Sequence, residues 1–162
     1  MNLMLLGNSC SGKTTLMKIL TEYGYHKMPT GDITRFLYEC GCQNMPVIVQ
    51  TLIENLRPDN YCFDHFYIHT MEQLHDVTGH WPTVINIIDK RTGDTHHSQD
   101  PAKIERKQER FNSQLPQIFE WLAKHKAVRV VTVYNTDYGF DMSELIEHKI
   151  VPYNTFAMVR LK

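Results

Sequence analysis

The sequence contains no long apolar run and no excess of charge of either sign. Its apolar stretches are all much shorter than the roughly 18 residues that a membrane-spanning helix needs, so we expect no contact with a membrane. Lys and Arg number 17 against 18 Asp and Glu, which gives a formal net charge of −1. This balance disfavours both a strongly basic nucleic-acid-binding protein and an acidic disordered tail, although it leaves room for a local basic patch.

The sequence also shows no secretory leader and no linker between domains. The segment from Met1 to Gly7 has neither the charged region nor the small-residue cleavage site of a secretory leader. No internal repeat, low-complexity segment or linker is found. The 162 residues, 42% of them hydrophobic, are enough for one core, so we expect a single domain over residues 1–162. We also expect a cytoplasmic location, in which the four cysteines are reduced thiols.

Short apolar runs alternate with segments of helical periodicity along the chain. The expected strands are Leu3–Leu6, residues 25–29, Tyr61–Phe63, Val84–Ile88 and Val128–Val133. The expected helices are Lys13–Tyr23, Asp32–Cys40, Pro46–Leu56, Thr70–Val77, Pro101–His125 with a bend at Pro116, and Met142–Lys149. This alternation predicts an α/β fold in which a parallel sheet of about five strands carries helices on both faces.

One motif has a specific chemical meaning. From Gly7 to Thr14 the chain reads G-N-S-C-S-G-K-T, which matches the phosphate-binding loop (P-loop) pattern G-x-x-x-x-G-K-[ST]. Glycines permit a tight loop whose backbone N–H groups point at phosphate oxygens, and the following helix adds the positive end of its dipole. Lys13 can reach the β- and γ-phosphates of ATP, and the hydroxyl of Thr14 can bind Mg²⁺. The expected nucleotide-binding residues are Gly7, Asn8, Ser9, Cys10, Ser11, Gly12, Lys13, Thr14 and Thr15.

Together with three further segments, the P-loop resembles the adenylate-kinase-like nucleoside monophosphate kinases. These segments are Gly31-Asp32-Ile33-Thr34-Arg35, Phe63-Asp64-His65-Phe66 and an arginine-bearing helix after residue 100, and the resemblance covers most of residues 1–150. It implies a three-layer P-loop fold that uses ATP and Mg²⁺ to phosphorylate a nucleotide-type acceptor. It assigns the acceptor's phosphate to Arg35 and the lining of the acceptor's base to Thr30 and Gly31, and it includes Asp32 among the substrate-binding residues. The acceptor-binding insert is expected over about residues 31–60.

Charged residues outside the P-loop supply the rest of the expected chemistry. Asp64 follows an apolar strand, and the carboxyl ends of parallel strands form the ligand-binding edge of such a sheet. There it can hold Mg²⁺ or accept a proton from an attacking hydroxyl, unless it only caps a helix. The polar loop over about residues 89–100 stands where the family has its lid, and Arg91 within it is expected to contact substrate. Arg106 aligns with the family's catalytic arginine and Arg110 lies one turn further, although a solvated charged face is the simpler alternative.

The sequence departs from this family at the acceptor side. The family reads D-G-F-P-R-T after the strand aspartate, and its arginine also binds the acceptor's phosphate; here the segment from Asp64 to Thr70 reads D-H-F-Y-I-H-T. The acceptor and lid segments are also short, which implies a more open cleft. The acceptor is therefore either a free nucleotide or a nucleotide within DNA, such as one carrying a hydroxymethylated pyrimidine. In its size and its missing arginine the chain resembles the phage DNA-modification kinases.

Two other classes of function are weighed against a kinase. A P-loop hydrolase that acts as a switch or motor is disfavoured because no guanine-reading N-K-x-D motif is present. A nucleotide-binding regulator without chemistry is disfavoured because it would not need Lys13, Thr14 and Asp64 together.

Overall fold

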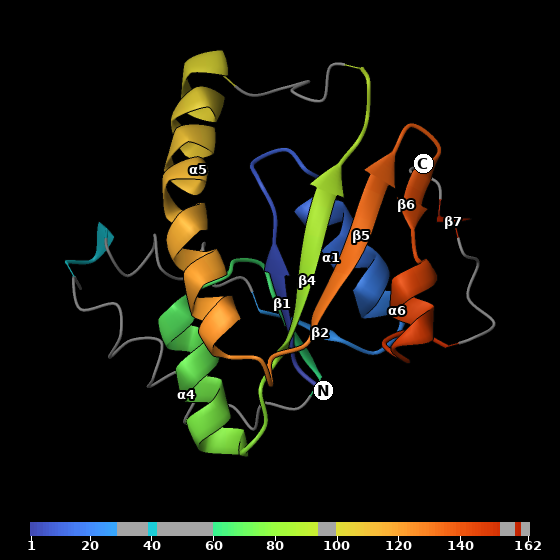
Figure 1. The fold of residues 1–162 in the computed structure, drawn as a ribbon. Helices are drawn as coiled ribbons and strands as arrows, with labels where there is room; N and C mark the ends of the chain where they lie inside the picture. Colours follow the sequence, from blue (N-terminus) through green and yellow to red (C-terminus); the bar gives the residue numbers. More distant parts are fainter. Residues whose placement is uncertain (29–38, 42–59, 94–99, 153–157, 160–162) are drawn as a thin grey trace.

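The computed structural model describes residues 1–28, 39–41, 60–93, 100–152 and 158–159, which form an α/β fold around one sheet (Figure 1). The sheet has seven strands in the order β2-β3-β1-β4-β5-β6-β7. They are β1 (Leu3–Leu6), β2 (His26–Met28), β3 (Tyr61–Phe63), β4 (Thr83–Asp89), β5 (Val130–Thr136), β6 (Gly139–Asp141) and β7 (Met158–Val159).

The first five strands of this order pair in parallel, as the alternating pattern predicts. β6 and β7 then extend the sheet in the antiparallel direction, which the sequence-based expectation of about five strands did not include. β6 is only three residues long and follows β5 after a two-residue turn, so it is too short to show a periodic pattern.

Four helices are described, and they cover both faces of the sheet. They are α1 (Lys13–Glu22), α4 (Ile68–Thr78), α5 (Pro101–Lys124) and α6 (Ser143–Glu147). α5 begins where expected, because the Asp100 side chain accepts a hydrogen bond from the Ala102 N–H and Pro101 occupies the first turn; the helix continues through Pro116. α6 is shorter than the expected Met142–Lys149. The helix expected at Pro46–Leu56, and all but the last two residues of that expected at Asp32–Cys40, lie outside the described residues.

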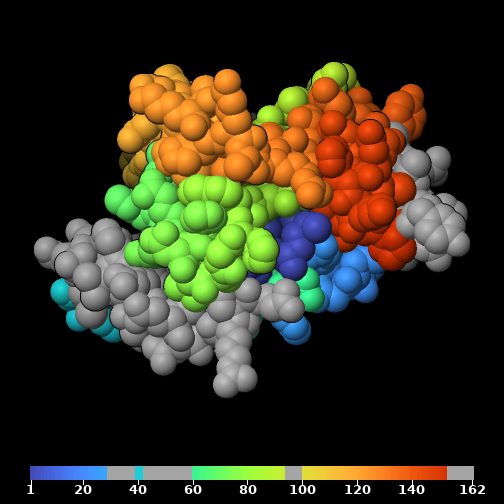
Figure 2. Space-filling model, turned by 60° about the horizontal axis from the view of Figure 1, so that its bottom comes forward, coloured from blue at the N-terminus to red at the C-terminus, as the bar shows by residue number. Residues whose placement is uncertain are grey.

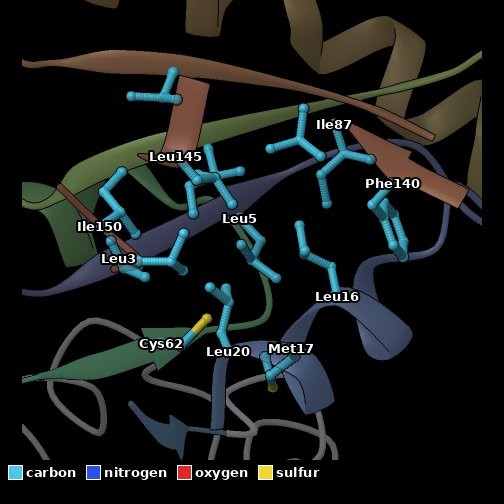
Figure 3. Packing of buried hydrophobic residues seen from close by; sticks show 14 of the residues in the cluster. Leu3, Leu5, Leu16, Met17, Leu20, Cys62, Ile87, Phe140, Leu145 and Ile150 are labelled. Carbon is cyan, nitrogen blue, oxygen red and sulfur yellow. The ribbon is translucent and has the colours of Figure 1, made fainter. Parts of the chain in front are cut away.

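The two faces of the sheet carry separate hydrophobic clusters, since successive side chains of a strand point to opposite sides. On β1, Leu3 and Leu5 face α1 and α6, whereas Met4 and Leu6 face α4 and α5. Figure 3 shows the first cluster, in which leucines of α1 and α6 close over the strands. The expected three-layer arrangement is therefore present in the described part of the chain.

The two ends of the sheet differ in what they expose. The arrowheads of β4 and β5 point to the end at which the loop after β1 enters α1, and the N-terminal half of α5 extends beyond them (Figure 1). Figure 2 shows the opposite end, where the first residues of the chain reach the surface between α4 and the α6 segment. The end with the carboxyl termini of the parallel strands is thus the one that holds the motif residues. Among the described helices, none is both long enough and apolar enough to cross a bilayer.

Candidate phosphate-binding site

The P-loop is a tight turn between β1 and α1. It leaves β1 after Leu6 and enters α1 at Lys13, with positive φ angles of 64° at Cys10 and 99° at Gly12. The Ser11 N–H donates to the Asn8 carbonyl at 3.1 Å, which closes a turn within the loop. Gly12 occupies the N-cap of α1 and offers no side-chain cap, so the first N–H groups of the helix are not capped by a side chain. Such N–H groups, at the positive end of the helix dipole, are suited to bind an anion.

Close packing requires both glycines of the motif, and the left-handed backbone requires Gly12 as well. A Cβ atom on Gly7 would come within 2.7 Å of the Ser11 Oγ atom. A Cβ atom on Gly12 would come within 2.5 Å of Asn135 Nδ2 and 2.9 Å of Phe140 Cζ. The loop therefore rests directly on side chains of β5 and β6, and the motif glycines make this approach possible.

Two consecutive carbonyl groups of the P-loop are held by side chains that are distant in sequence, Arg91 after β4 and Asn135 on β5. The guanidinium of Arg91 donates to the Cys10 carbonyl at 2.6 Å, and its Nε and Nη2 atoms each lie 2.9 Å from a carboxylate oxygen of Asp89. The Asn135 Nδ2 atom donates to the Ser11 carbonyl at 3.0 Å. Arg91, which sequence reasoning expects to contact substrate, is thus placed beside the P-loop and supports its backbone.

Lys13 follows the P-loop that leaves β1, and Asp64 follows the neighbouring strand β3. Burial lowers the pKa of Lys13 below its ordinary value, the nearby Asp64 carboxylate raises this pKa, and the positive charge of Lys107 lowers it further. Asp64 follows the last residue of β3 directly, so it lies at the carboxyl edge of the sheet, as expected. The structure therefore brings together the P-loop lysine, the strand-end carboxylate and a cation of α5.

The cations of α5 differ in their exposure. Burial and the Asp64 carboxylate raise the pKa of Tyr67, and the positive charge of the exposed Arg110 lowers it. Arg106 is exposed, whereas Lys107 is half-buried. Lys107 is three residues after the buried Ile104 and therefore shares the sheet-facing side of the helix, which Arg106 does not.

Sequence reasoning missed two residues of this site, Lys107 and Asn135. Lys107 could have been found from the apolar spacing on α5, because Ile104 and Phe111 flank it at intervals of three and four residues on the buried side. No sequence signal identifies Asn135, since its partner Ser11 is 124 positions away. The expected acceptor residues Thr30, Asp32 and Arg35 lie outside the described residues.

The side-chain oxygen atoms of Thr14 and Asp64 are suited to a magnesium ion that also binds the phosphates of a nucleotide. They are less suited to a metal ion whose ligands all come from the protein. Thr14 is exposed in the first turn of α1, and Asp64 lies at the strand end beside Lys13. Within the described ranges, no group of three or more His, Cys, Asp or Glu side chains could hold a metal ion. Mg²⁺ is typically bound by one or two protein oxygens together with the phosphates of the nucleotide, and this pair fits that requirement.

Comparisons with known proteins add a fold-level likeness only. No protein-family model matches the sequence, and no curated protein matches it. Among solved structures, a gluconokinase from Sinorhizobium meliloti 1021 is similar with a TM-score of 0.45 and 11% sequence identity, over 81% of this chain and 81% of that chain. The function is therefore inferred from the residues of the site.

Proposed function

We propose that this chain is an ATP-dependent phosphotransferase that moves the γ-phosphoryl group to a nucleotide-type acceptor. The observation that carries the proposal is that the P-loop, which leads from β1 to Lys13, and Asp64, which follows β3, lie at the carboxyl ends of two neighbouring parallel strands. The charges of Asp64 and of Lys107 on α5 both act on Lys13. A loop that only binds phosphate needs neither a strand-end carboxylate nor charges from a third element. Phosphoryl transfer uses both, because the nucleophile must be oriented and the charge on the transferred group must be stabilised.

On the donor side, the P-loop and Lys13 bind the phosphates of ATP. The N–H groups at the start of α1 surround the phosphate oxygens, and Lys13 supplies a positive charge at the β- and γ-phosphates. The burial that lowers the pKa of Lys13 also removes water around its ammonium group, which strengthens its attraction to phosphate. Thr14 and Asp64 would hold Mg²⁺, which neutralises phosphate charge when it is bound.

On the acceptor side, the role of Asp64 depends on the chemistry of the attacking group. An oxygen of the acceptor forms a bond to the γ-phosphorus as the bond from this phosphorus to the β,γ-bridging oxygen breaks. A hydroxyl acceptor loses its proton in this step, and we propose that the Asp64 carboxylate receives it. A phosphate acceptor is already ionised at neutral pH and needs no base. We propose Arg35, Thr30 and Asp32 as acceptor-binding residues.

The test of this function is a transfer screen with ATP labelled in its γ-phosphate. The acceptors are nucleoside monophosphates, nucleosides, and single- and double-stranded DNA with and without hydroxymethylated pyrimidines. We expect labelled product from at least one acceptor, and a loss on the order of 10³-fold for Lys13→Ala, since this lysine acts on the charge of the reacting phosphates. Lys18→Ala, on the exposed side of α1, is the matched control and should retain activity.

Each other outcome points to a different class of protein. Release of inorganic phosphate without labelled acceptor would indicate a hydrolase, and ATP binding without turnover would indicate a regulator. Full transfer by Lys13→Ala with an unchanged fold would refute the donor site itself.

A second experiment separates the two types of acceptor. With a hydroxyl acceptor, Asp64→Asn should abolish transfer at every Mg²⁺ concentration while acceptor binding stays normal. With a phosphate acceptor, the same variant should act through Mg²⁺ alone, so that an excess of Mg²⁺ restores part of the rate. Full rescue would exclude a general base, and no rescue with normal binding would exclude a purely metal-binding role.

A further inference from the structure

We propose that Asn135 is a positioning residue that prepares the P-loop for anion binding by orienting the peptide group between Ser11 and Gly12. This inference rests on the donor site of the proposed function and adds a residue that the P-loop motif does not contain. Asn135 is fully buried near the end of β5, and its Nδ2 atom donates to the Ser11 carbonyl at 3.0 Å.

The hydrogen bond from Asn135 determines where the next N–H group points. In a planar trans peptide, the carbonyl and the following N–H point in opposite directions. Because the Ser11 carbonyl is held toward β5, the Gly12 N–H is directed away from β5, and it makes no hydrogen bond to any described residue. With this peptide reversed, a carbonyl oxygen with partial negative charge would face the phosphate in place of a donor.

Asn135 can impose this orientation because its backbone is held between the end of β4 on one side and β6 on the other. Its backbone carbonyl accepts a hydrogen bond from the Lys90 N–H at 2.7 Å at the end of β4. On the other side it pairs with Phe140 of β6. The Phe140 ring is fully buried below Gly12, and Figure 3 shows it beside Leu16 of α1. The antiparallel turn between β5 and β6 thus forms a rigid support for the P-loop.

Two buried polar atoms indicate that Asn135 has a role besides packing. The Asn135 Oδ1 and Ser11 Oγ atoms are both buried and have no hydrogen-bond partner among the described residues. Burial of an unpaired carboxamide oxygen opposes folding, and an apolar side chain of similar size would avoid that cost. What an apolar residue could not supply is the donor to the Ser11 carbonyl.

The test compares two substitutions at Asn135 with a control on the same strand and the same face. Asn135→Leu keeps the volume and removes the donor, and Asn135→Asp places a carboxylate against the Ser11 carbonyl. Val133→Ala removes buried side-chain volume two residues away and leaves the hydrogen bond to the Ser11 carbonyl in place. For each protein, the Kd of tripolyphosphate and of ATP with Mg²⁺ is measured by calorimetry, and the Tm is measured in the absence of ligand.

We expect both Asn135 variants to raise the Kd of tripolyphosphate and of ATP by about 10- to 100-fold, the effect of losing a hydrogen bond to a charged group. Val133→Ala should lower the Tm and leave both Kd values within about twofold, since it disturbs no group near the anion. In ¹⁵N-labelled protein, tripolyphosphate should shift the Gly12 amide resonance strongly in the wild type and weakly in Asn135→Leu.

Wild-type affinity in Asn135→Leu, or an equal rise in Kd for Val133→Ala at an equal loss of Tm, would overturn the proposal. If Asn135→Asp does not fold, Asn135→Leu and the Gly12 resonance still decide the question. Failure of the proposed function would look different, because the wild-type protein itself would then bind neither tripolyphosphate nor ATP.

Discussion

The two glycines at the ends of α1 provide a direct test of how tightly the P-loop is packed against β5 and β6. Gly12 precedes the helix with φ of 99°, and Gly24 follows it with φ of 96°. An alanine at either position suffers nearly the same backbone strain. The surroundings differ, because a Cβ atom on Gly24 meets nothing within 4 Å, whereas one on Gly12 meets buried side chains at 2.5 and 2.9 Å.

The expected magnitudes follow from these two contributions. Left-handed backbone costs a residue with a Cβ atom about 1–2 kcal/mol, so Gly24→Ala should lower the free energy of unfolding by about that amount. Gly12→Ala bears the same strain and also overpacks a core site, which typically costs about 1–3 kcal/mol more. Neither Asn135 nor Phe140 can move away into solvent, because both are fully buried. For a chain of this size, each kcal/mol corresponds to about 2–4 °C in Tm.

The assay is urea unfolding of the wild type and both variants, followed by circular dichroism, with anion binding measured on the folded proteins. Similar m-values would show that the variants unfold from a comparably compact state, so that the midpoints report stability. We expect Gly12→Ala to be the less stable variant and to lose affinity for tripolyphosphate, while Gly24→Ala keeps that affinity. Equal losses of stability, or wild-type anion affinity in Gly12→Ala, would refute the close packing on which the P-loop argument depends.

Three further predictions concern other parts of the molecule. Lys107→Ala should lower kcat by about 10- to 100-fold with little change in ATP affinity, because Lys107 is half-buried and its charge acts on Lys13. Substitution of the exposed Arg106 by Ala should have a smaller effect, and the reverse order in steady-state kinetics would support the sequence-based assignment of Arg106. Burial, and then Asp64, raises the pKa of the Cys62 thiol to about 12, so alkylation at pH 8 followed by mass spectrometry should modify it far more slowly than an exposed cysteine. Between about pH 9, the ordinary pKa of this thiol, and pH 12, the unfolded chain loses the proton and the folded protein keeps it, so the free energy of unfolding should fall with rising pH. Rapid labelling would contradict the burial of Cys62. Tyr25→Phe should lower the free energy of unfolding by about 1–3 kcal/mol, because its hydroxyl donates to a buried carbonyl at 2.7 Å; a neutral result in urea unfolding would show that this bond adds nothing.

Much of the fold could be predicted because its signals are local. The apolar run Leu3–Leu6 indicates β1, and segments rich in β-branched residues indicate β4 and β5, although β5 begins and ends later than the expected Val128–Val133. The helical spacing of Leu16, Met17 and Leu20 indicates α1. The P-loop is encoded in the same way, since its glycines and its lysine act within one turn of chain between a strand and a helix. β6 could not be predicted, because a strand of three residues is stabilised by its pairing with β5 and not by any pattern of its own.

The sequence by itself determined that the chain has a P-loop at the carboxyl edge of a parallel sheet, because neighbouring residues are sufficient for that geometry. Only the tertiary structure decided which distant side chains complete the site. Asn135 and Arg91 hold consecutive P-loop carbonyls from 124 and 81 positions away, and Lys107 rather than Arg106 lies on the sheet-facing side of α5. Such contacts depend on how strands and helices pack against one another, and this packing is set by the whole core and not by any segment alone.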